Sequence, residues 1–240
     1  MKRGMFEKIF FAGLVSVSFS LGIGITGNAA ANQADSEGEI ELIPHESPTD
    51  PKDPAAPSEP QEPIDPNNPA TDNKGPLSLD VVPKGFYFGA QKMYHSAHKY
   101  PAVGAVEHKQ YLQVTDNRGE GSYGWTLKVR QDGYLRNKQS RYALKGATLF
   151  LPNGEARNRN NHEGATEIDP DLTTHNVEVT NEEKIIFSAP DDASKKAGKS
   201  VSTNSWQSQG VSLMIPKGIA REGEYSNKIY WILTDGGPTN

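Results

Sequence analysis

The chain has 240 residues, of which 23% are charged, with 17 Pro, 23 Gly, no Cys and a formal net charge of -5. The absence of Cys excludes a disulfide-held scaffold, so burial of apolar side chains has to stabilise the core. Residues 77–240 contain 20 bases and 18 acids, and this near balance argues against a nucleic-acid-binding domain, which would favour a basic patch.

The N-terminus has the pattern of a secretory signal peptide. Lys2, Arg3 and Lys8 precede an apolar run over residues 9–25, and Ala29-Ala30-Ala31 supplies the small residues that a signal peptidase needs. The run contains Gly and is marginal for a membrane-spanning helix, and no basic stop-transfer patch follows it. We therefore expect residues 1–31 to be a cleaved signal peptide and the mature, secreted chain not to span a membrane.

Residues 32–76 have the composition of a linker. They contain 10 of the 17 Pro and 11 acids against two bases, and they have no aromatic residue. Pro recurs at every third position from Pro48 to Pro69, which is the period of a polyproline II helix. Because hydrophobic residues are too few to offset the entropy of folding, the pattern predicts an acidic linker, disordered or in polyproline II conformation. The alternative, a ligand for a proline-recognition module, is less favoured because such modules usually want a basic residue nearby.

Residues 77–240 are predicted to be an all-β domain, an antiparallel β-sandwich. Apolar residues alternate with a period of two in seven short runs, at 77–81, 111–114, 125–129, 147–151, 177–179, 211–215 and 229–233. Turn residues such as Asp132-Gly133 and Asn153-Gly154 separate several of these runs. A sandwich is favoured over a barrel because the strands are short and two long polar connections, 91–109 and 155–176, interrupt them.

Two W-x-L motifs stand out within this domain. The first is Gly124-Trp125-Thr126-Leu127, and the second follows Tyr225 in Tyr225-x-x-x-Ile229-Tyr230-Trp231-Ile232-Leu233. In a strand, residues i and i+2 face the same side, so each Trp and its Leu form one apolar face. That face either enters the core or contacts a ligand. Burial energy favours the core.

These motifs and their flanks resemble the WxL-domain surface proteins of low-GC Gram-positive bacteria. The similarity spans most of residues 77–240 and is carried also by Leu77-Ser78-Leu79-Asp80-Val81-Val82-Pro83, Leu112-Gln113-Val114-Thr115-Asp116-Asn117-Arg118-Gly119 and Leu144-Lys145-Gly146-Ala147-Thr148-Leu149. The sequence departs from the usual second motif at Tyr230, where Thr commonly precedes the Trp, and at Gly236-Gly237, which lengthens the step to Pro238.

The resemblance implies a secreted surface protein that attaches non-covalently to the cell wall, with peptidoglycan as the expected ligand. It implies a wall-binding motif, either in contact with the ligand or as its scaffold, made of Trp125, Leu127, Tyr225, Trp231 and Leu233. It also implies an alternative role, as a subunit that docks onto a membrane-anchored extracellular partner protein. Covalent sortase anchoring is not expected, because the sequence has no L-P-x-T-G motif.

Other chemistry has weaker support. His95, His98 and His108 lie in one connection, but a metal site needs three or four converging ligands, and neither a Cys nor an acid stands between the first two. A pair of carboxylates for glycoside hydrolysis could come from Glu163, Glu167, Asp169 and Asp171, although these lie in a polar connection. We therefore expect no metal, no cofactor, no catalytic residues and no enzymatic activity.

Overall fold

The computed structural model describes residues 35–104, 109–161 and 166–238, so the expected signal peptide lies outside the described residues. The described part is mostly β-strand, arranged in several antiparallel sheets. It contains no α-helix, and its one helical turn is the 3-10 turn η1 (Ser208–Gly210). Within these residues, therefore, no helix has the length and apolar character needed to cross a membrane.

Three sheets have four strands each. The first has the order β3 (Leu77–Val81), β5 (Lys109–Asp116), β13 (Ser200–Gln207) and β9 (Glu155–Asn158). The second has the order β10 (Thr173–Thr174), β12 (Lys184–Ala189), β6 (Trp125–Gln131) and β16 (Ile229–Asp235). The third has the order β11 (Val177–Val179), β8 (Thr148–Leu151), β14 (Ser212–Ile215) and β4 (His98–Pro101).

Two short two-stranded antiparallel pairs complete the described strands. β1 (Lys52–Asp53) pairs with β2 (Ala56–Pro60), and β7 (Arg136–Asn137) pairs with β15 (Tyr225–Ser226). All seven runs predicted from alternation contain strands, namely β3, β5, β6, β8, β11, β14 and β16. The prediction of an antiparallel all-β domain is therefore confirmed.

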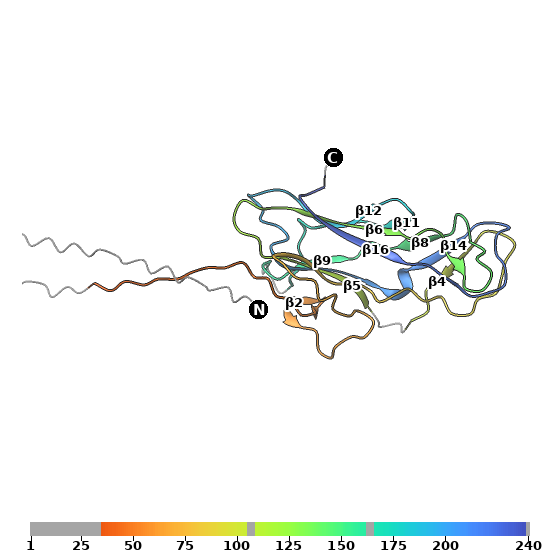
Figure 1. Ribbon diagram of the computed structural model, residues 1–240, viewed down its shortest axis with the longest axis horizontal. Coiled ribbons are helices and arrows are strands. Elements are labelled where there is room, and N and C mark those ends of the chain that lie inside the picture. The colour runs from red at the N-terminus through yellow and green to blue at the C-terminus, as the bar shows by residue number, and fades with distance from the viewer. Residues whose placement is uncertain (1–34, 105–108, 162–165, 239–240) are drawn as a thin grey trace, which may run out of the picture. The chain divides into compact units, whose positions relative to one another are not determined.

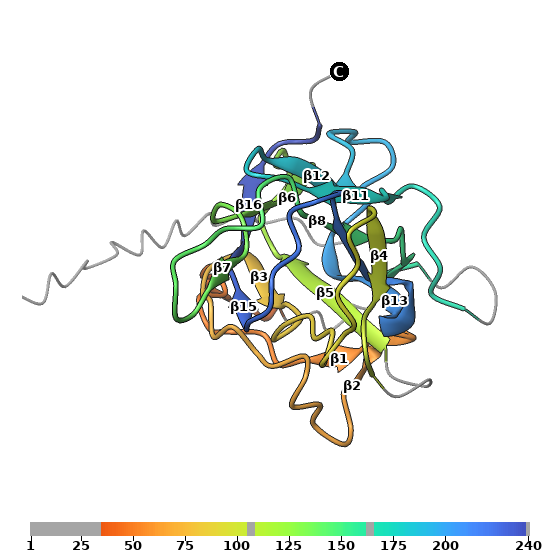
Figure 2. The same cartoon turned by 90° about the vertical axis from the view of Figure 1, so that its right-hand side faces the viewer.

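The core lies where the three four-stranded sheets meet. Figures 1 and 2 both place β6, β11 and β12 in a layer above β5. Side chains from all three sheets form one cluster of buried residues, which includes Leu112, Val114, Trp125, Leu127, Leu149, Leu151, Val177, Phe187 and Trp206. Burial of this shared cluster supplies the stabilisation that a domain without disulfides requires.

The sequence pattern missed several strands, of which β13 is the most central. It pairs with β5 along its whole length and with β9 on the other side. Its sequence, Ser-Val-Ser-Thr-Asn-Ser-Trp-Gln, carries no apolar alternation, although most of its residues are buried. Two further missed strands, β4 and β9, lie inside the connections 91–109 and 155–176 that were expected to be irregular.

The expectation of an extended linker up to residue 76 is wrong for residues 50–72. Residues 35–48 form no strand and are exposed, as expected for a linker. From Asp50 onward, however, the chain forms the β1–β2 pair, and Pro54, Pro57 and Asn68 are buried. We call residues 50–72 the strap. In both cartoon views β2 lies below β5, on the side away from β6.

Hydrogen bonds hold the strap on the outer face of the first sheet. The Lys52 N–H donates to Gln113 Oε1 at 2.7 Å, and Gln113 Nε2 donates to the Asp50 carbonyl at 3.1 Å. Thr203 Oγ1 donates to the Pro54 carbonyl at 3.1 Å. Polyproline II and β conformations are neighbours in φ and ψ. A Pro-rich segment can therefore adopt strand geometry. It does so at a sheet edge, where the N–H groups that Pro lacks are not needed for pairing with a further strand.

Asp80, on β3, lies beside Gln113 and is 2% exposed. Its carboxylate accepts hydrogen bonds from Ser78 Oγ at 2.5 Å, Thr115 Oγ1 at 2.6 Å and Gln113 Nε2 at 3.1 Å. Burial raises the carboxyl pKa of Asp80 above its ordinary value of 3.8, although these hydrogen bonds act in the opposite direction. Ionisation of Asp80 therefore disfavours the folded state.

We predict a pH-dependent stability difference between the wild type and Asp80→Asn. Because the folded-state pKa of Asp80 is raised, its neutral carboxyl stabilises the folded state. This stabilisation is complete below pH 3.8, the ordinary pKa, and is lost as the pH rises through the raised folded-state pKa. The free energy of unfolding of the wild type should thus fall relative to that of the variant as the pH rises from below 3.8 through the raised folded-state value. Urea denaturation of both proteins across this range measures the difference, and a difference that does not change with pH would contradict the prediction.

Candidate functional site

The two W-x-L motifs, far apart in sequence, lie side by side on β6 and β16. These strands pair antiparallel, with Leu127 opposite Leu233 and Trp231 opposite Val129. Directly opposite residues of an antiparallel pair share one face of the sheet. The four Trp and Leu side chains of the motifs therefore lie on the same, inward face.

On that face the first motif is fully buried. Trp125 and Leu127 are each 0% exposed. The Trp125 ring packs edge-on against Phe187, with 4.8 Å between ring centroids, and its indole N–H donates to the Gly198 carbonyl at 3.1 Å. Trp125 and Leu127 are accordingly core residues and have no free surface for a ligand.

The second motif is less enclosed. Trp231 and Leu233 are half-buried and pack against the main cluster. β16 is an edge strand, with β6 on one side only, so the inward side chains of β16 close the open margin of the core. Trp231 and Leu233 combine a packing role with some exposed surface.

Close backbone approach explains the glycines that flank both motifs. Gly124 has a φ of +70°, and a Cβ at this position would lie 2.6 Å from the Gly237 nitrogen. The Gly236 N–H donates to the Gly124 carbonyl at 3.2 Å, and Thr126 Oγ1 donates to the Gly236 carbonyl at 3.0 Å. The Gly236-Gly237 step noted in the sequence thus lets the end of the second motif pack against the start of the first.

A group of charged residues ties these strand ends to β5. Two guanidinium nitrogens of Arg118 donate to the carboxylate of Asp116, which is 1% exposed, and a third contact reaches Asp235 at the end of β16. Arg118 also donates to the Gly124 carbonyl at 2.8 Å, and Lys199 Nζ lies 3.3 Å from Asp116. The hydrogen bond with Asp116 is the main cause that raises the guanidinium pKa of Arg118.

Tyr225 does not join the other four predicted site residues. It lies on β15 opposite Asn137 and packs with a second hydrophobic cluster, around Leu144, Ala147 and Leu213. Its hydroxyl donates to the Arg221 carbonyl at 3.1 Å. The structure therefore brings together Trp125, Leu127, Trp231 and Leu233 and leaves Tyr225 at a different cluster.

The outward face of the same two strands carries the exposed side chains. Tyr230 is 37% exposed, and the guanidinium carbon of Arg130, directly across on β6, lies 4.5 Å from its ring centroid. Ile232 and Lys128 form the next outward pair, and Lys128 Nζ lies 3.3 Å from Glu183. The W-x-L pattern does not single out this surface, although the period of two that places Trp231 inward also places Tyr230 and Ile232 outward.

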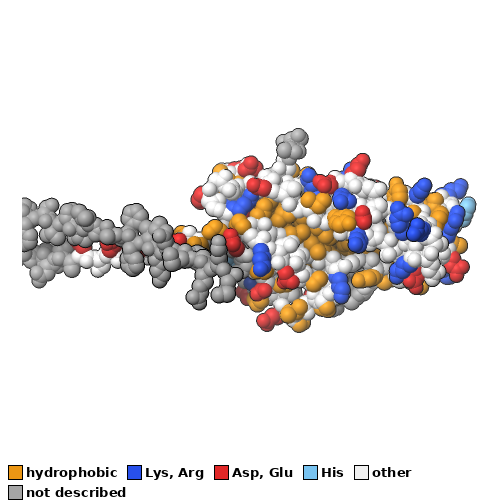
Figure 3. Space-filling view, viewed as in Figure 1, with side chains coloured by type: hydrophobic (Ala, Val, Ile, Leu, Met, Phe, Trp, Pro, Cys, Tyr) orange, Lys and Arg blue, Asp and Glu red, His pale blue; other side chains and the backbone are white. Residues whose placement is uncertain are grey.

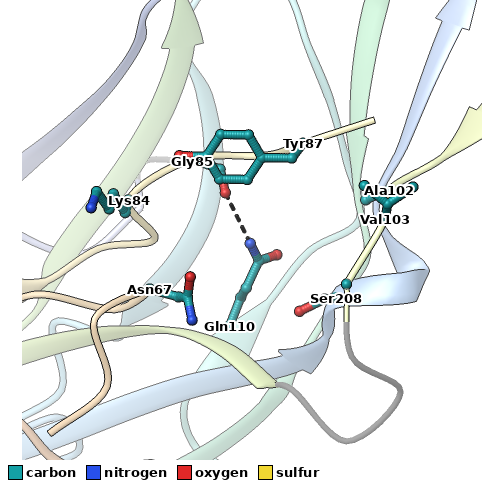
Figure 4. A pocket seen from close by; sticks show the side chains of 9 residues that line it. Asn67, Lys84, Gly85, Tyr87, Ala102, Val103, Gln110 and Ser208 are labelled. Carbon is teal, nitrogen blue, oxygen red and sulfur yellow. Dashed lines mark hydrogen bonds between the residues drawn. The ribbon is translucent and has the colours of Figure 1, made fainter. Parts of the chain in front are cut away.

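A separate cavity of about 180 Å³ lies away from these strands. Figure 4 shows Lys84, Tyr87 and Gln110 around it, and Gln110 Nε2 donates to the Gly85 carbonyl at 3.1 Å. The other amide atom, Gln110 Oε1, is buried without a hydrogen-bond partner among the described residues.

The residues weighed for metal binding or hydrolysis have structural contacts where they are described. The His98 ring stacks on Tyr94, with 3.9 Å between centroids. Glu167 accepts a hydrogen bond from the Ser58 N–H of the strap, and Asp171 pairs with Lys195 Nζ at 2.5 Å. Burial raises the carboxyl pKa of Asp169. His108 and Glu163 lie outside the described residues.

Comparison with known proteins adds one result to this geometry. The family described as WxL domain, surface cell wall-binding, matches residues 29–236. The match includes both W-x-L strands and also the strap, well before residue 77. No curated protein and no solved structure matches the chain.

Proposed function

Because the chain belongs to the family of WxL-domain surface cell wall-binding proteins, we propose that it binds peptidoglycan non-covalently through the outward face of β6 and β16. The family places the protein at the cell surface or in the cell wall. One observation carries the choice of face, the exposed Tyr230 ring with the guanidinium of Arg130 over it.

The chemistry of this face suits a glycan strand with peptide branches. An aromatic ring on a flat sheet offers an apolar surface to the C–H groups of a sugar ring. Arg130 and Lys128 supply cations for the carboxylates that peptidoglycan carries, and a guanidinium can form two parallel hydrogen bonds with one carboxylate. The proposed activity is therefore binding, without a chemical step.

In this proposal the W-x-L residues form a scaffold. Trp125 and Leu127 are fully buried and Trp231 and Leu233 are half-buried on the inward face. They hold β6 and β16 in register, and this register sets Tyr230 beside Arg130. Loss of a motif residue would then weaken wall binding by disturbing the sheet.

Export and layer arrangement are parts of the same proposal. We infer that residues 1–31 direct secretion as a signal peptide and that the sheets form a β-sandwich. A single buried cluster with side chains from three four-stranded sheets supports the sandwich. Residues 35–48, which are exposed and form no strand, support a linker shorter than the 32–76 expected from the sequence.

We predict that Tyr230→Ala weakens binding to the wall without unfolding the domain. Removal of an exposed ring at the centre of a contact surface should raise the dissociation constant about tenfold. Cosedimentation with bare sacculi, stripped of teichoic acids, measures this constant directly.

The matched control is Tyr87→Ala, which removes a ring that is 59% exposed and lies outside β6 and β16. Both variants should melt within a few degrees of the wild type, since surface substitutions rarely change stability by more than about 0.5 kcal/mol. If Tyr230→Ala binds as the wild type does, the outward face is not the binding surface. If the wild type itself fails to cosediment, direct peptidoglycan binding is wrong.

The second candidate function, docking onto a membrane-anchored extracellular protein, is supported by the open edge of β16. Among the described residues, the backbone of 229–235 forms no hydrogen bond on the side away from β6. Figure 3 shows hydrophobic side chains gathered over β16, and the half-buried residues next to the core include Leu77, Val82, Phe86, Ile229, Trp231 and Leu233. Such an edge can accept a strand of another protein. A stoichiometric partner that stays crosslinked to the protein after muramidase digestion would favour this function.

A further inference from the structure

One end of the domain is built from three connecting segments, 92–99, 134–146 and 216–225, which we call the basic end. The Gly218 N–H donates to the His95 carbonyl at 2.9 Å, which joins the first and third segments. Tyr142 Oη donates to the Ile219 carbonyl at 2.9 Å, and the Lys138 N–H donates to the Glu224 carbonyl at 2.9 Å. The three segments therefore form one continuous surface.

This surface is strongly positive although the whole chain is acidic. The three segments contain eight Lys or Arg and only two acids, whereas the chain has a formal net charge of -5. All eight cations are exposed, namely Lys92, Lys99, Arg136, Lys138, Arg141, Lys145, Lys217 and Arg221. Figure 3 shows Lys and Arg side chains gathered at the end of the domain near β4 and β14.

Most of these cations have no acidic partner in the part of the chain that the structure describes. Lys138 pairs with Glu224 at 3.1 Å. Arg221 lies over the ring of Tyr142 at 4.0 Å, and Lys99 lies over the ring of Phe150 at 4.8 Å. On other surfaces, by contrast, lysines pair with acids, as Lys128 does with Glu183, Lys184 with Glu182, Lys195 with Asp171 and Lys196 with Glu120.

The basic end rests on a fixed base. The second hydrophobic cluster, with Leu144, Ala147 and Leu213 at its centre, lies beneath it and includes Leu135, Tyr142, Ile215, Ile219 and Tyr225. The buried Asn137 side chain accepts the N–H groups of Gln139 and Ser140 and so fixes the turn between Lys138 and Arg141. The exposed cations are thus presented by an ordered backbone, which lowers the entropic cost of binding a partner.

We propose that the basic end binds a linear phosphodiester polyanion of the cell wall. Several unneutralised cations on one surface favour a ligand with repeated negative charges, because each contact after the first forms at high effective concentration. Guanidinium groups suit phosphate in particular, since they present paired donors to it. The family binds the cell wall, and this location favours a wall polymer over a lipid bilayer. The site is distinct from the β6–β16 face.

The test uses the purified chain and a lipid-free poly(glycerol phosphate) teichoic acid, without peptidoglycan. The wild type should bind the polymer, and the affinity should fall as salt is raised, because condensed counterions are released on binding. A variant that removes four cations without an acidic partner among the described residues, Arg136→Gln/Arg141→Gln/Lys145→Gln/Lys217→Gln, should bind at least about tenfold more weakly at low ionic strength.

A charge-matched control separates a local site from net charge. The control variant Arg157→Gln/Lys184→Gln/Lys195→Gln/Lys196→Gln removes the same number of cations from acid-paired positions, and its affinity should stay within about twofold of the wild type. Thermal melting verifies that both variants are folded. Equal losses in the two variants would overturn the proposal, as would absence of binding by the wild type.

Two further arms distinguish the polymer from other sources of phosphate. Binding to vesicles of phosphatidylcholine and phosphatidylglycerol, or to duplex DNA, more tightly than to the polymer would also overturn the proposal. Tyr230 lies outside the basic end, so the Tyr230→Ala variant should bind the polymer as the wild type does. If the wild type fails to cosediment with stripped sacculi, the peptidoglycan proposal is wrong, but the result for binding to the polymer still stands.

Discussion

Trp125→Ala is expected to lower the free energy of unfolding by about 3–5 kcal/mol, the range for removal of a buried Trp from a packed core. The ring is 0% exposed, packs edge-on against Phe187 and donates its N–H to the Gly198 carbonyl. The substitution leaves a cavity among side chains of the main cluster and leaves that carbonyl without its donor. Urea denaturation followed by circular dichroism measures the change.

The second Trp provides the comparison. Trp231 lies on the same face but is half-buried on the edge strand, so Trp231→Ala should cost less, about 2 kcal/mol. A larger cost for Trp231→Ala than for Trp125→Ala would contradict the assignment of the first motif as the interior scaffold. Wall binding of either variant has to be measured below its melting temperature, because an unfolded fraction alone would lower the bound amount.

Alternation in the sequence predicted the strands whose two faces have different surroundings. β6 and β16 place Trp and Leu inward and, apart from Ile232, Thr, Lys, Arg or Tyr outward, so the period of two is plain. β13 lacks such a contrast, because polar side chains are buried on both of its faces, Ser202 and Asn204 on the inward face and Thr203 on the outer face that the strap covers. Thr203 illustrates this, since it is 0% exposed and donates to the Pro54 carbonyl. Patterning detects contrast between faces, and a strand buried on both faces offers none.

The strap shows a different limit of sequence analysis. Its composition, rich in Pro and acids, fits a linker when it is considered alone. Its fold depends on a partner surface, the outer face of β5 and β13, that the strap sequence does not encode. Gln113 joins the two, because its side chain bonds with both Asp50 and Lys52. A segment ordered by tertiary contacts of this kind cannot be identified from its own pattern.

Of the candidate site, the sequence motifs identified the strands but not the exposed residues. Trp125 and Leu127 are recognisable because the fold requires them in its core, whereas Tyr230 and Arg130 are adjacent only after β16 pairs with β6. The basic end could not be predicted from the sequence for a related reason. Residues 77–240 are nearly balanced in charge, and only the fold gathers the cations of three separate segments on one surface.

The other large effect is expected for Arg118→Ala, which should lower the free energy of unfolding by about 3 kcal/mol. The substitution removes the guanidinium that donates twice to the buried Asp116 carboxylate. Among the described residues, that charge keeps only the backbone N–H of residue 118 and Lys199 Nζ as partners. It also removes the donor to the Gly124 carbonyl and the ion pair with Asp235. The start of the first W-x-L motif and the end of the second would both lose their link to β5. Urea denaturation at neutral pH measures the loss.

Lys128→Ala is the matched control, because it breaks an exposed ion pair on the surface of the sheet that contains β6 and β16. Lys128 Nζ lies 3.3 Å from Glu183, whose side chain is 44% exposed, and such pairs contribute less than about 1 kcal/mol. Arg118→Lys should give an intermediate loss, because an ammonium keeps the charge but cannot bond Asp116, Asp235 and Gly124 at once. Equal losses in Arg118→Ala and Lys128→Ala would show that burial of Asp116 does not set the strength of the network. Arg118 also affects the motifs, because its contacts with Gly124 and Asp235 fix the ends of both strands. The register of β6 and β16, and with it the outward position of Tyr230 beside Arg130, therefore depends on a residue outside either W-x-L sequence.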